Sequence, residues 1–185
     1  VSMTTTGNMA AAILAATALW LGGCGGRPGE IASPEATLSA EEGSPGFLDR
    51  VSSRPAVSQN DAARGMLMLV GEAEPEATFA RRVEKLRRLD LAPGRWRWDA
   101  EAPIDRARLA YMVYQACEVR GGLMLTITGP NRRYCLKELQ YQGIIGEGSG
   151  FTPVSGMEFV AIIARADAYL STGEVPETLS PIAGD

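Results

Sequence analysis

The stretch FTPVSGMEF at residues 151–159 carries the signals of a loop that turns into a helix. Ser155 is a residue type that favours the N-cap, and Glu158, three residues later, completes a capping box. Gly156 to about Leu170 then has apolar residues at helical spacing. They are Phe159, Ile162, Ile163 and Ala166. The stretch therefore predicts a helix over about residues 156–170 with one face in a core.

Two earlier stretches begin helices in the same way, with an apolar β-branched residue directly before a capping residue. The three starts are separated by 47 and 50 residues. A period in this range is typical of stacked or pseudo-symmetric units. The three pairs are Val57-Ser58, Ile104-Asp105 and Val154-Ser155.

The remaining pattern predicts a mainly α fold. Helical spacing and cap residues predict helices over residues 58–70, about 76–89, 105–119 and about 133–142, with Gly143 as a left-handed C-terminal cap. The run LMLTIT at residues 123–128 alternates apolar and polar residues, which predicts one short strand. We therefore expect a small helical domain over residues 57–170, built from two to three helix-loop-helix units.

The last of these units resembles the S-layer homology domain. In that family a helix ends near Gly-Ile-Ile, a loop reads Gly-Phe-x-Pro, and a second helix opens Val-Thr-Arg-Ala-Glu-Phe. The corresponding residues here are 143–145 (GII) and 150–159 (GFTPVSGMEF). The middle unit matches through Trp98 and residues 103–110, and the first unit only through its second helix. The resemblance covers about residues 57–170.

The resemblance implies three units with pseudo-threefold symmetry and binding to cell-wall polysaccharide. In that family the Arg of the opening motif helps to hold an anionic glycan. Only Arg106 matches that Arg, because Gln59 and Gly156 stand at the other two places. The resemblance therefore implies at most one groove with an anion-binding residue, at Arg106.

The residues before Arg106 offer a second reason to consider glycan. Residues 80–108 contain nine basic and five acidic residues, and Trp96 and Trp98 alternate with arginines. Aromatic faces stack on sugar rings, and Arg pairs with carboxylate or phosphate. The alternative is that the arginines form a solvated helix face while one Trp fills the core. We expect one ring to point inward and the other outward, so that both interpretations hold together.

The N-terminal residues predict export and lipid attachment. Residues 9–23, MAAAILAATALWLGG, are uncharged and have the length of a signal-peptide core, which predicts a signal peptide over residues 1–23. The sequence Leu21-Gly22-Gly23-Cys24 resembles the lipobox of bacterial lipoproteins, in which the Cys receives the lipid. An ordinary secretory signal that contains a Cys is the alternative. Residues 24–56 are rich in Gly, Pro, Ser and Glu and predict a flexible tether.

Composition argues against several classes of function. The chain has no His and a net charge of −4. The commonest general base is therefore missing, and the balance is not that of a nucleic-acid-binding protein. We expect no enzyme activity, no metal and no cofactor. Cys117 and Cys135 are either a disulfide of an oxidising compartment or buried free thiols.

Two functions follow from these observations. The first is a lipid-anchored, non-enzymatic protein of the cell envelope, on its periplasmic or outer-membrane side, that binds cell-wall glycan or tethers envelope layers. The second is an accessory lipoprotein subunit that binds another envelope protein. Residues 171–185 show no pattern and predict a loose C-terminal tail.

Overall fold

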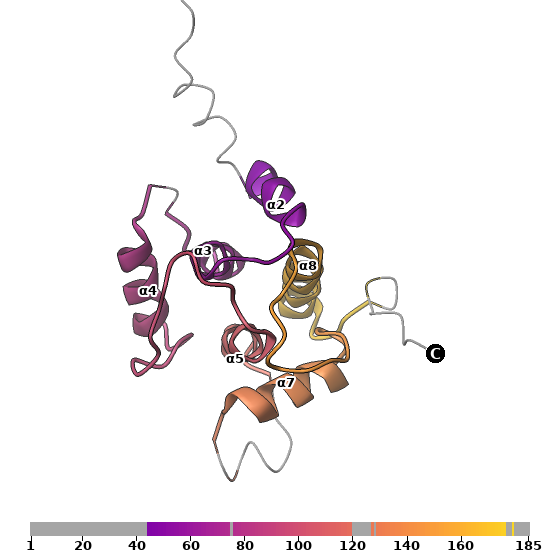
Figure 1. The fold of residues 1–185 in the computed structure, drawn as a ribbon. Coiled ribbons are helices and arrows are strands. Elements are labelled where there is room, and N and C mark those ends of the chain that lie inside the picture. The colour runs from indigo at the N-terminus through magenta and orange to yellow at the C-terminus, as the bar shows by residue number, and fades with distance from the viewer. Residues whose placement is uncertain (1–43, 75, 120–126, 128, 177–178, 180–185) are drawn as a thin grey trace, which may run out of the picture. The chain divides into compact units, whose positions relative to one another are not determined.

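The described residues of the computed structural model are 44–74, 76–119, 127, 129–176 and 179. They contain six helices, so the expected mainly α fold is confirmed (Figure 1). Of the strand expected at residues 123–128, only Ile127 is described. The signal peptide, Cys24 and residues 25–43 also lie outside the described part. The six helices are α2 (Ser44–Ser52), α3 (Gln59–Leu69), α4 (Phe79–Arg88), α5 (Arg106–Ala116), α7 (Arg132–Tyr141) and α8 (Gly156–Thr172).

Side-chain caps mark where five of these helices, α3, α4, α5, α7 and α8, begin. Ser58, Asp105 and Ser155 each accept a hydrogen bond from the backbone N–H three residues later, as the sequence predicts. Thr78 and Asn131 cap α4 and α7 in the same manner. Each cap satisfies one of the N–H groups that a helix start leaves without an intrahelical partner.

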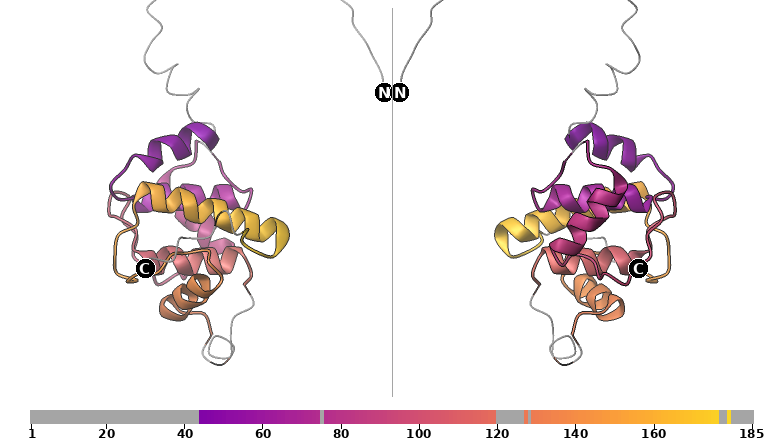
Figure 2. Two further views of the ribbon diagram at one scale, coloured as in Figure 1. Left: turned by 90° about the vertical axis from the view of Figure 1, so that its right-hand side faces the viewer. Right: turned by 90° about the vertical axis from the view of Figure 1, so that its left-hand side faces the viewer.

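In chain order the helices form three helix-loop-helix units, α2 with α3, α4 with α5, and α7 with α8. The first helix of each unit packs on the second helix of the preceding unit, since α4 contacts α3 and α7 contacts α5. The series closes because α2 contacts α8 (Figures 1 and 2). The three units therefore form a ring.

The centre of this ring is made by the residues before the three caps. The Val57 N–H donates to the Val154 carbonyl (2.8 Å), the Ile104 N–H to the Val57 carbonyl (2.9 Å), and the Val154 N–H to the Ile104 carbonyl (3.1 Å). These three hydrogen bonds close on themselves, and all three side chains are fully buried. The three predicted helix starts are thus structurally equivalent and related by a pseudo-threefold arrangement.

A second set of backbone hydrogen bonds surrounds the first. The first N–H of α3, α5 and α8 each donates to a carbonyl in the loop before another helix of the set. These N–H groups have no partner within their own helix, so the neighbouring unit satisfies them. The bonds are Gln59 to Ala102 (2.8 Å), Arg106 to Thr152 (3.0 Å) and Gly156 to Arg54 (2.9 Å).

Helix α2 corrects the predicted boundary of the tether. The tether was expected to reach residue 56, but Ser44–Ser52 is helical, and Phe47 and Val51 are buried. These two side chains lie four residues apart and therefore share one face of the helix. Burying a side chain of this kind stabilises a fold by about 1.5–3 kcal/mol. The folded part therefore includes α2 as the first helix of the first unit.

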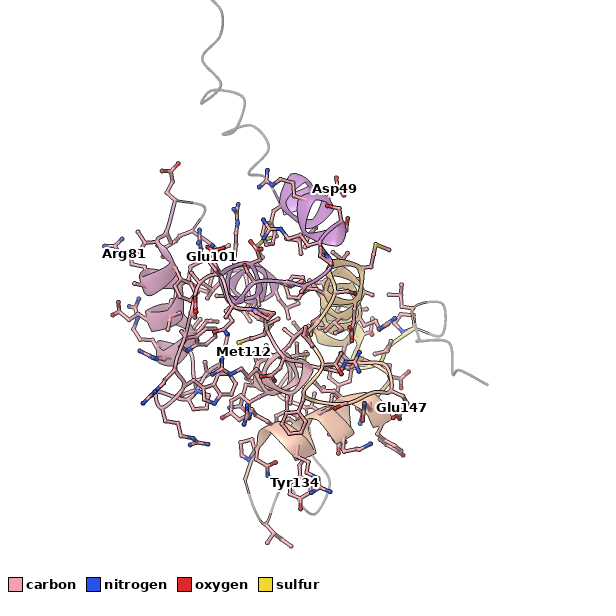
Figure 3. All side chains as sticks on the ribbon, viewed as in Figure 1. Asp49, Arg81, Glu101, Met112, Tyr134 and Glu147 are labelled. Carbon is pink, nitrogen blue, oxygen red and sulfur yellow. The ribbon has the colours of Figure 1, made fainter. Side chains whose placement is uncertain are left out.

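The interior of the ring is apolar and tightly packed. Met112 of α5 is fully buried near the centre, whereas Asp49, Arg81 and Glu147 lie at the surface (Figure 3). A Cβ atom added to Gly65 in α3 would lie 2.4 Å from the Phe159 ring of α8. This contact explains a glycine in the middle of a helix.

The described part of the C-terminal segment contacts the domain. Helix α8 ends at Thr172, and Gly173 follows with a left-handed φ of 80°. Val175 packs against the core. The Arg165 side chain donates a hydrogen bond to the Leu179 carbonyl. The expectation of a loose tail is therefore wrong for Thr172, Val175 and Leu179, and residues 177–178 and 180–185 lie outside the described part.

Candidate functional site

Arg106, the expected glycan-binding residue, forms an ion pair with Glu158. Its Nε and Nη2 atoms both lie 2.7 Å from Glu158 Oε1. The two side chains are only 13% and 23% exposed. Hydrogen bonds between charged groups are the stronger ones in proteins. Arg106 therefore ties the start of α5 to the start of α8, and its charge is neutralised within the fold.

The residues at the two positions equivalent to Arg106, Gly156 and Gln59, also make contacts within the ring of helices. At Gly156, an added Cβ would lie 1.8 Å from the Val51 carbonyl oxygen, so no other side chain fits without moving α2. Gln59 is buried, and its amide nitrogen donates to the Pro103 carbonyl (3.5 Å) while its amide oxygen accepts the Asp99 N–H (3.2 Å). None of the three motif positions presents a free anion-binding group.

Both tryptophans point inward, which corrects the expected inward and outward pair. Trp96 is 9% exposed and Trp98 is half-buried, with their ring centroids 6.0 Å apart. Residues two apart in an extended segment project to the same side, and the residues between them project to the other. The alternation therefore places Arg95 and Arg97 in solvent and both rings against the core.

The exposed arginines border a hollow of about 440 Å³, which we call the arginine hollow. Its lining combines one loop with α5 and the start of α7. No Asp or Glu is among the lining residues, although the hollow belongs to an acidic chain. The lining residues used below are Arg95, Trp96, Arg97, Arg108, Tyr111 and Arg132.

Arg108 is held in place from two sides. Its guanidinium lies 5.1 Å from the Trp96 ring centroid and 5.8 Å from that of Trp98, both within cation–π range. Its Nη2 donates to the Arg97 carbonyl (2.8 Å). A guanidinium fixed in this way loses little side-chain entropy when it binds a ligand. The role of the two tryptophans is therefore to position the Arg108 guanidinium at the hollow.

The charge of the hollow is only weakly compensated. Asp105 lies 4.0 Å from Arg108 Nε and 3.9 Å from Arg132 Nη1, at the limit for an ion pair. Contacts this long between partly exposed groups contribute little. Burial raises the pKa of the Tyr111 phenol, so this lining residue is neutral and adds no negative charge at neutral pH. The hollow therefore presents several cations and no lining carboxylate, which suits a carboxylate- or phosphate-bearing ligand.

Sequence reasoning found part of this surface and missed the rest. The basic excess of residues 80–108 includes Arg95, Arg97 and Arg108. Arg132 belongs to α7 and joins them only because α7 packs on α5. No local pattern in the sequence indicates that contact.

The two cysteines are free thiols in the structure, and both are buried. The disulfide interpretation is therefore set aside for the second alternative, buried free thiols. Burial raises the pKa of each thiol to about 12. The Cys117 thiol lies 3.8 Å from the Ala166 carbonyl of α8. A thiol with so high a pKa stays protonated at neutral pH and reacts slowly.

Comparisons with known proteins do not assign this chain to a family. No family model matches it, and no curated protein and no solved structure shows significant similarity to it. None of the described helices has the length and apolar character needed to cross a membrane.

Proposed function

We propose that the protein is a non-enzymatic component of the cell envelope that binds anionic cell-wall glycan at the arginine hollow. The observation that carries this proposal is the lining itself, in which four arginines meet without a carboxylate. Arg forms bidentate hydrogen bonds with carboxylate and phosphate groups. A local cationic surface on an acidic protein also steers an anionic polymer towards one face.

The proposed location rests on the N-terminal sequence. The lipobox-like residues 21–24 suggest a lipid on Cys24 after removal of residues 1–23. Several acyl chains on one Cys hold a protein at a membrane, since each buried CH₂ contributes about 0.8 kcal/mol. The residues between Cys24 and α2 then form a shorter tether than the sequence alone indicates. The glycan-binding domain would be held close to the membrane.

Co-sedimentation of the purified protein with isolated envelope glycan tests the proposal. The test variant carries Arg95→Ala and Arg97→Ala, because both side chains are exposed and their loss leaves the core intact. We expect the affinity to fall about tenfold or more, as two charge-assisted contacts are lost. We also expect wild-type binding to weaken as salt is added.

The matched control is Arg88→Ala, which removes an exposed arginine of α4 that lines a different hollow. It should bind glycan like the wild type. Wild-type protein that stays in the supernatant at low salt would contradict the proposal. An equal loss of glycan affinity in the control and the test variant would mean that binding depends on overall positive charge and not on the arginine hollow.

A second candidate function is binding to another envelope protein. It is favoured by two large apolar side chains of the third unit, Tyr141 at the end of α7 and Met157 at the start of α8, which are both exposed. Aromatic and Met side chains are enriched in protein interfaces. Crosslinking to one defined envelope protein that is lost with Tyr141→Ser and Met157→Ser, while glycan binding is kept, would favour this function.

A further inference from the structure

A second hollow of about 590 Å³ adjoins the arginine hollow. The two share Asn131 and Arg132 at the start of α7. We call the second one the apolar hollow, because Ala107, Leu136 and Phe151 are among its lining residues. The residues used below are Ala107, Arg132, Arg133, Leu136, Lys137 and Phe151.

The apolar hollow combines an apolar floor with cations. Ala107 and Leu136 are buried beneath it. Arg132, Arg133 and Lys137 contribute positive charge, and its lining again contains no Asp or Glu. Both hollows are of the size usual for ligand sites in proteins. Six different cations therefore line two adjoining hollows without a carboxylate in either lining.

Phe151 gives the second hollow an exposed aromatic ring. Its side chain is 89% exposed, although it borders a hollow with a buried apolar floor. Among the aromatic side chains that line these two hollows, Trp96 is buried and Tyr111 is partly buried, so Phe151 offers the most exposed ring. An exposed ring beside cations can stack on the apolar face of a sugar whose acid group is held by Arg.

We infer that the ligand is a linear chain of acidic sugars that occupies both hollows at once. One unit places its acid group among Arg95, Arg108 and Arg132, and a neighbouring unit lies against Phe151 with its acid group near Arg133 and Lys137. Arg132 lies between the two. This inference rests on the proposed function and specifies its ligand as a polymer with alternating ring and charge contacts.

A polymer exploits adjoining hollows in a way that a single anion does not. Once one unit is bound, the next is held at a high effective concentration, which raises affinity by about 10²–10⁴-fold when the geometry fits. Affinity should therefore rise steeply with chain length until both hollows are filled. Beyond that length it should change little per unit.

Titration calorimetry with probes of defined chemistry tests the inference. Oligogalacturonates of one to eight units supply sugar rings with carboxylates, linear polyphosphate supplies charge without rings, and dextran oligomers supply rings without charge. We expect the octamer to bind at least about 100-fold more tightly than the monomer. Dextran should show no binding, because both hollows require an anion.

The variant Phe151→Ala separates stacking from charge. Its side chain is exposed, so the fold should be kept, which thermal unfolding verifies. We expect its affinity for the oligogalacturonate octamer to fall about fivefold, and its affinity for polyphosphate to change less than about twofold. Tyr141→Ala is the matched control, since Tyr141 is 85% exposed and lines neither hollow. It should bind both polymers like the wild type.

The outcomes separate this inference from the proposed function. Equal affinity for monomer and octamer, or the same loss for both polymers in Phe151→Ala, would overturn the inference. Failure of wild-type protein to bind any oligogalacturonate would overturn it as well. Co-sedimentation with envelope glycan then decides the proposed function independently. Binding there, lost with Arg95→Ala and Arg97→Ala, would keep the arginine hollow as a glycan site.

Discussion

The start of α8 packs against two other helices, and the two junctions are built differently. One is held by an ion pair between side chains, and the other depends on the absence of a side chain. Towards α5, Glu158 Oε1 accepts a hydrogen bond from Arg106 Nε at 2.7 Å and lies 2.7 Å from Arg106 Nη2. Towards α2, Gly156 leaves space for the Val51 carbonyl, which would lie 1.8 Å from any Cβ. In both junctions the N–H groups around the caps bond to a neighbouring unit. The backbone pattern is thus repeated, while the side chain at the first helical position varies.

This difference shows which positions of the repeated motif keep the same structural role in all three units and which do not. The capping residue and the apolar residue before it keep one structural role in all three units. The first helical residue does not, since it is Gln59, Arg106 or Gly156. A function assigned to this position by resemblance therefore does not transfer to the present chain. The arginines that we propose as ligand-binding residues instead line the arginine hollow, in the loop before α5, in α5 itself and at the start of α7.

The largest effect is expected at the glycine junction, where the obstacle is a backbone oxygen that cannot rotate away. Gly156→Ala should force α2 from its place and cost about 3 kcal/mol, the upper end for overpacking. The cost is limited because α2 can detach, at the expense of the burial of Phe47 and Val51. Urea unfolding measures the loss, and hydrogen exchange should locate it in α2.

Gly94→Ala is the matched control for this change. An added Cβ at Gly94 meets nothing within 4 Å, so stability should change by less than about 0.5 kcal/mol. If Gly156→Ala were as stable as Gly94→Ala, the close contact between α2 and α8 would not exist in solution.

The ion-pair junction should give the next largest effect. Arg106→Ala leaves the mostly buried Glu158 without its partner, and we expect a loss of about 2 kcal/mol. A double-mutant cycle with Glu158→Gln isolates the pair and should give a coupling of about 1 kcal/mol or more. Additive losses in the cycle would show that the two side chains do not interact.

A smaller effect is expected at the ion pair of the first unit. Arg54 Nη1 lies 2.7 Å from Asp61 Oδ2, at the same distance as the pair between Arg106 and Glu158. The Arg54 side chain is 50% exposed, however, and exposed pairs contribute about 0.2–1 kcal/mol. Arg54→Ala should therefore destabilise clearly less than Arg106→Ala in the same urea titration. Equal losses would mean that burial does not distinguish the two pairs.

The smallest expected effect concerns the Cys117 thiol, which contacts Ala166 of α8, ten residues along that helix from Gly156. If Gly156→Ala releases only α2, thiol labelling of Cys117 under native conditions should speed up by less than about twofold. Labelling that accelerates strongly would show that the substitution loosens the core, so that the two junctions are not independent. Mass spectrometry of the labelled peptide gives the rate.

Local signals in the sequence account for what could be predicted. Ser58, Asp105 and Ser155 cap helices through contacts within three residues, so their roles are visible in the sequence. Helix α2 is not visible in this way, because Phe47 and Val51 gain their stability from distant residues and lie in a stretch rich in Gly and Pro. The basic residues of the arginine hollow were likewise predicted only in part. Arg132 joins the others through the packing of α7 on α5, which no local pattern indicates.

The closed ring of backbone hydrogen bonds is tested most directly by hydrogen exchange of the amides of Val57, Ile104 and Val154. All three lie outside the helices, where amides usually exchange fast. Because each donates to a buried carbonyl at the centre of the ring, we expect them to exchange only on global unfolding, as slowly as the slowest helical amides. Exchange of any one of them as fast as the exposed loop amide of Gly94 would contradict the ring.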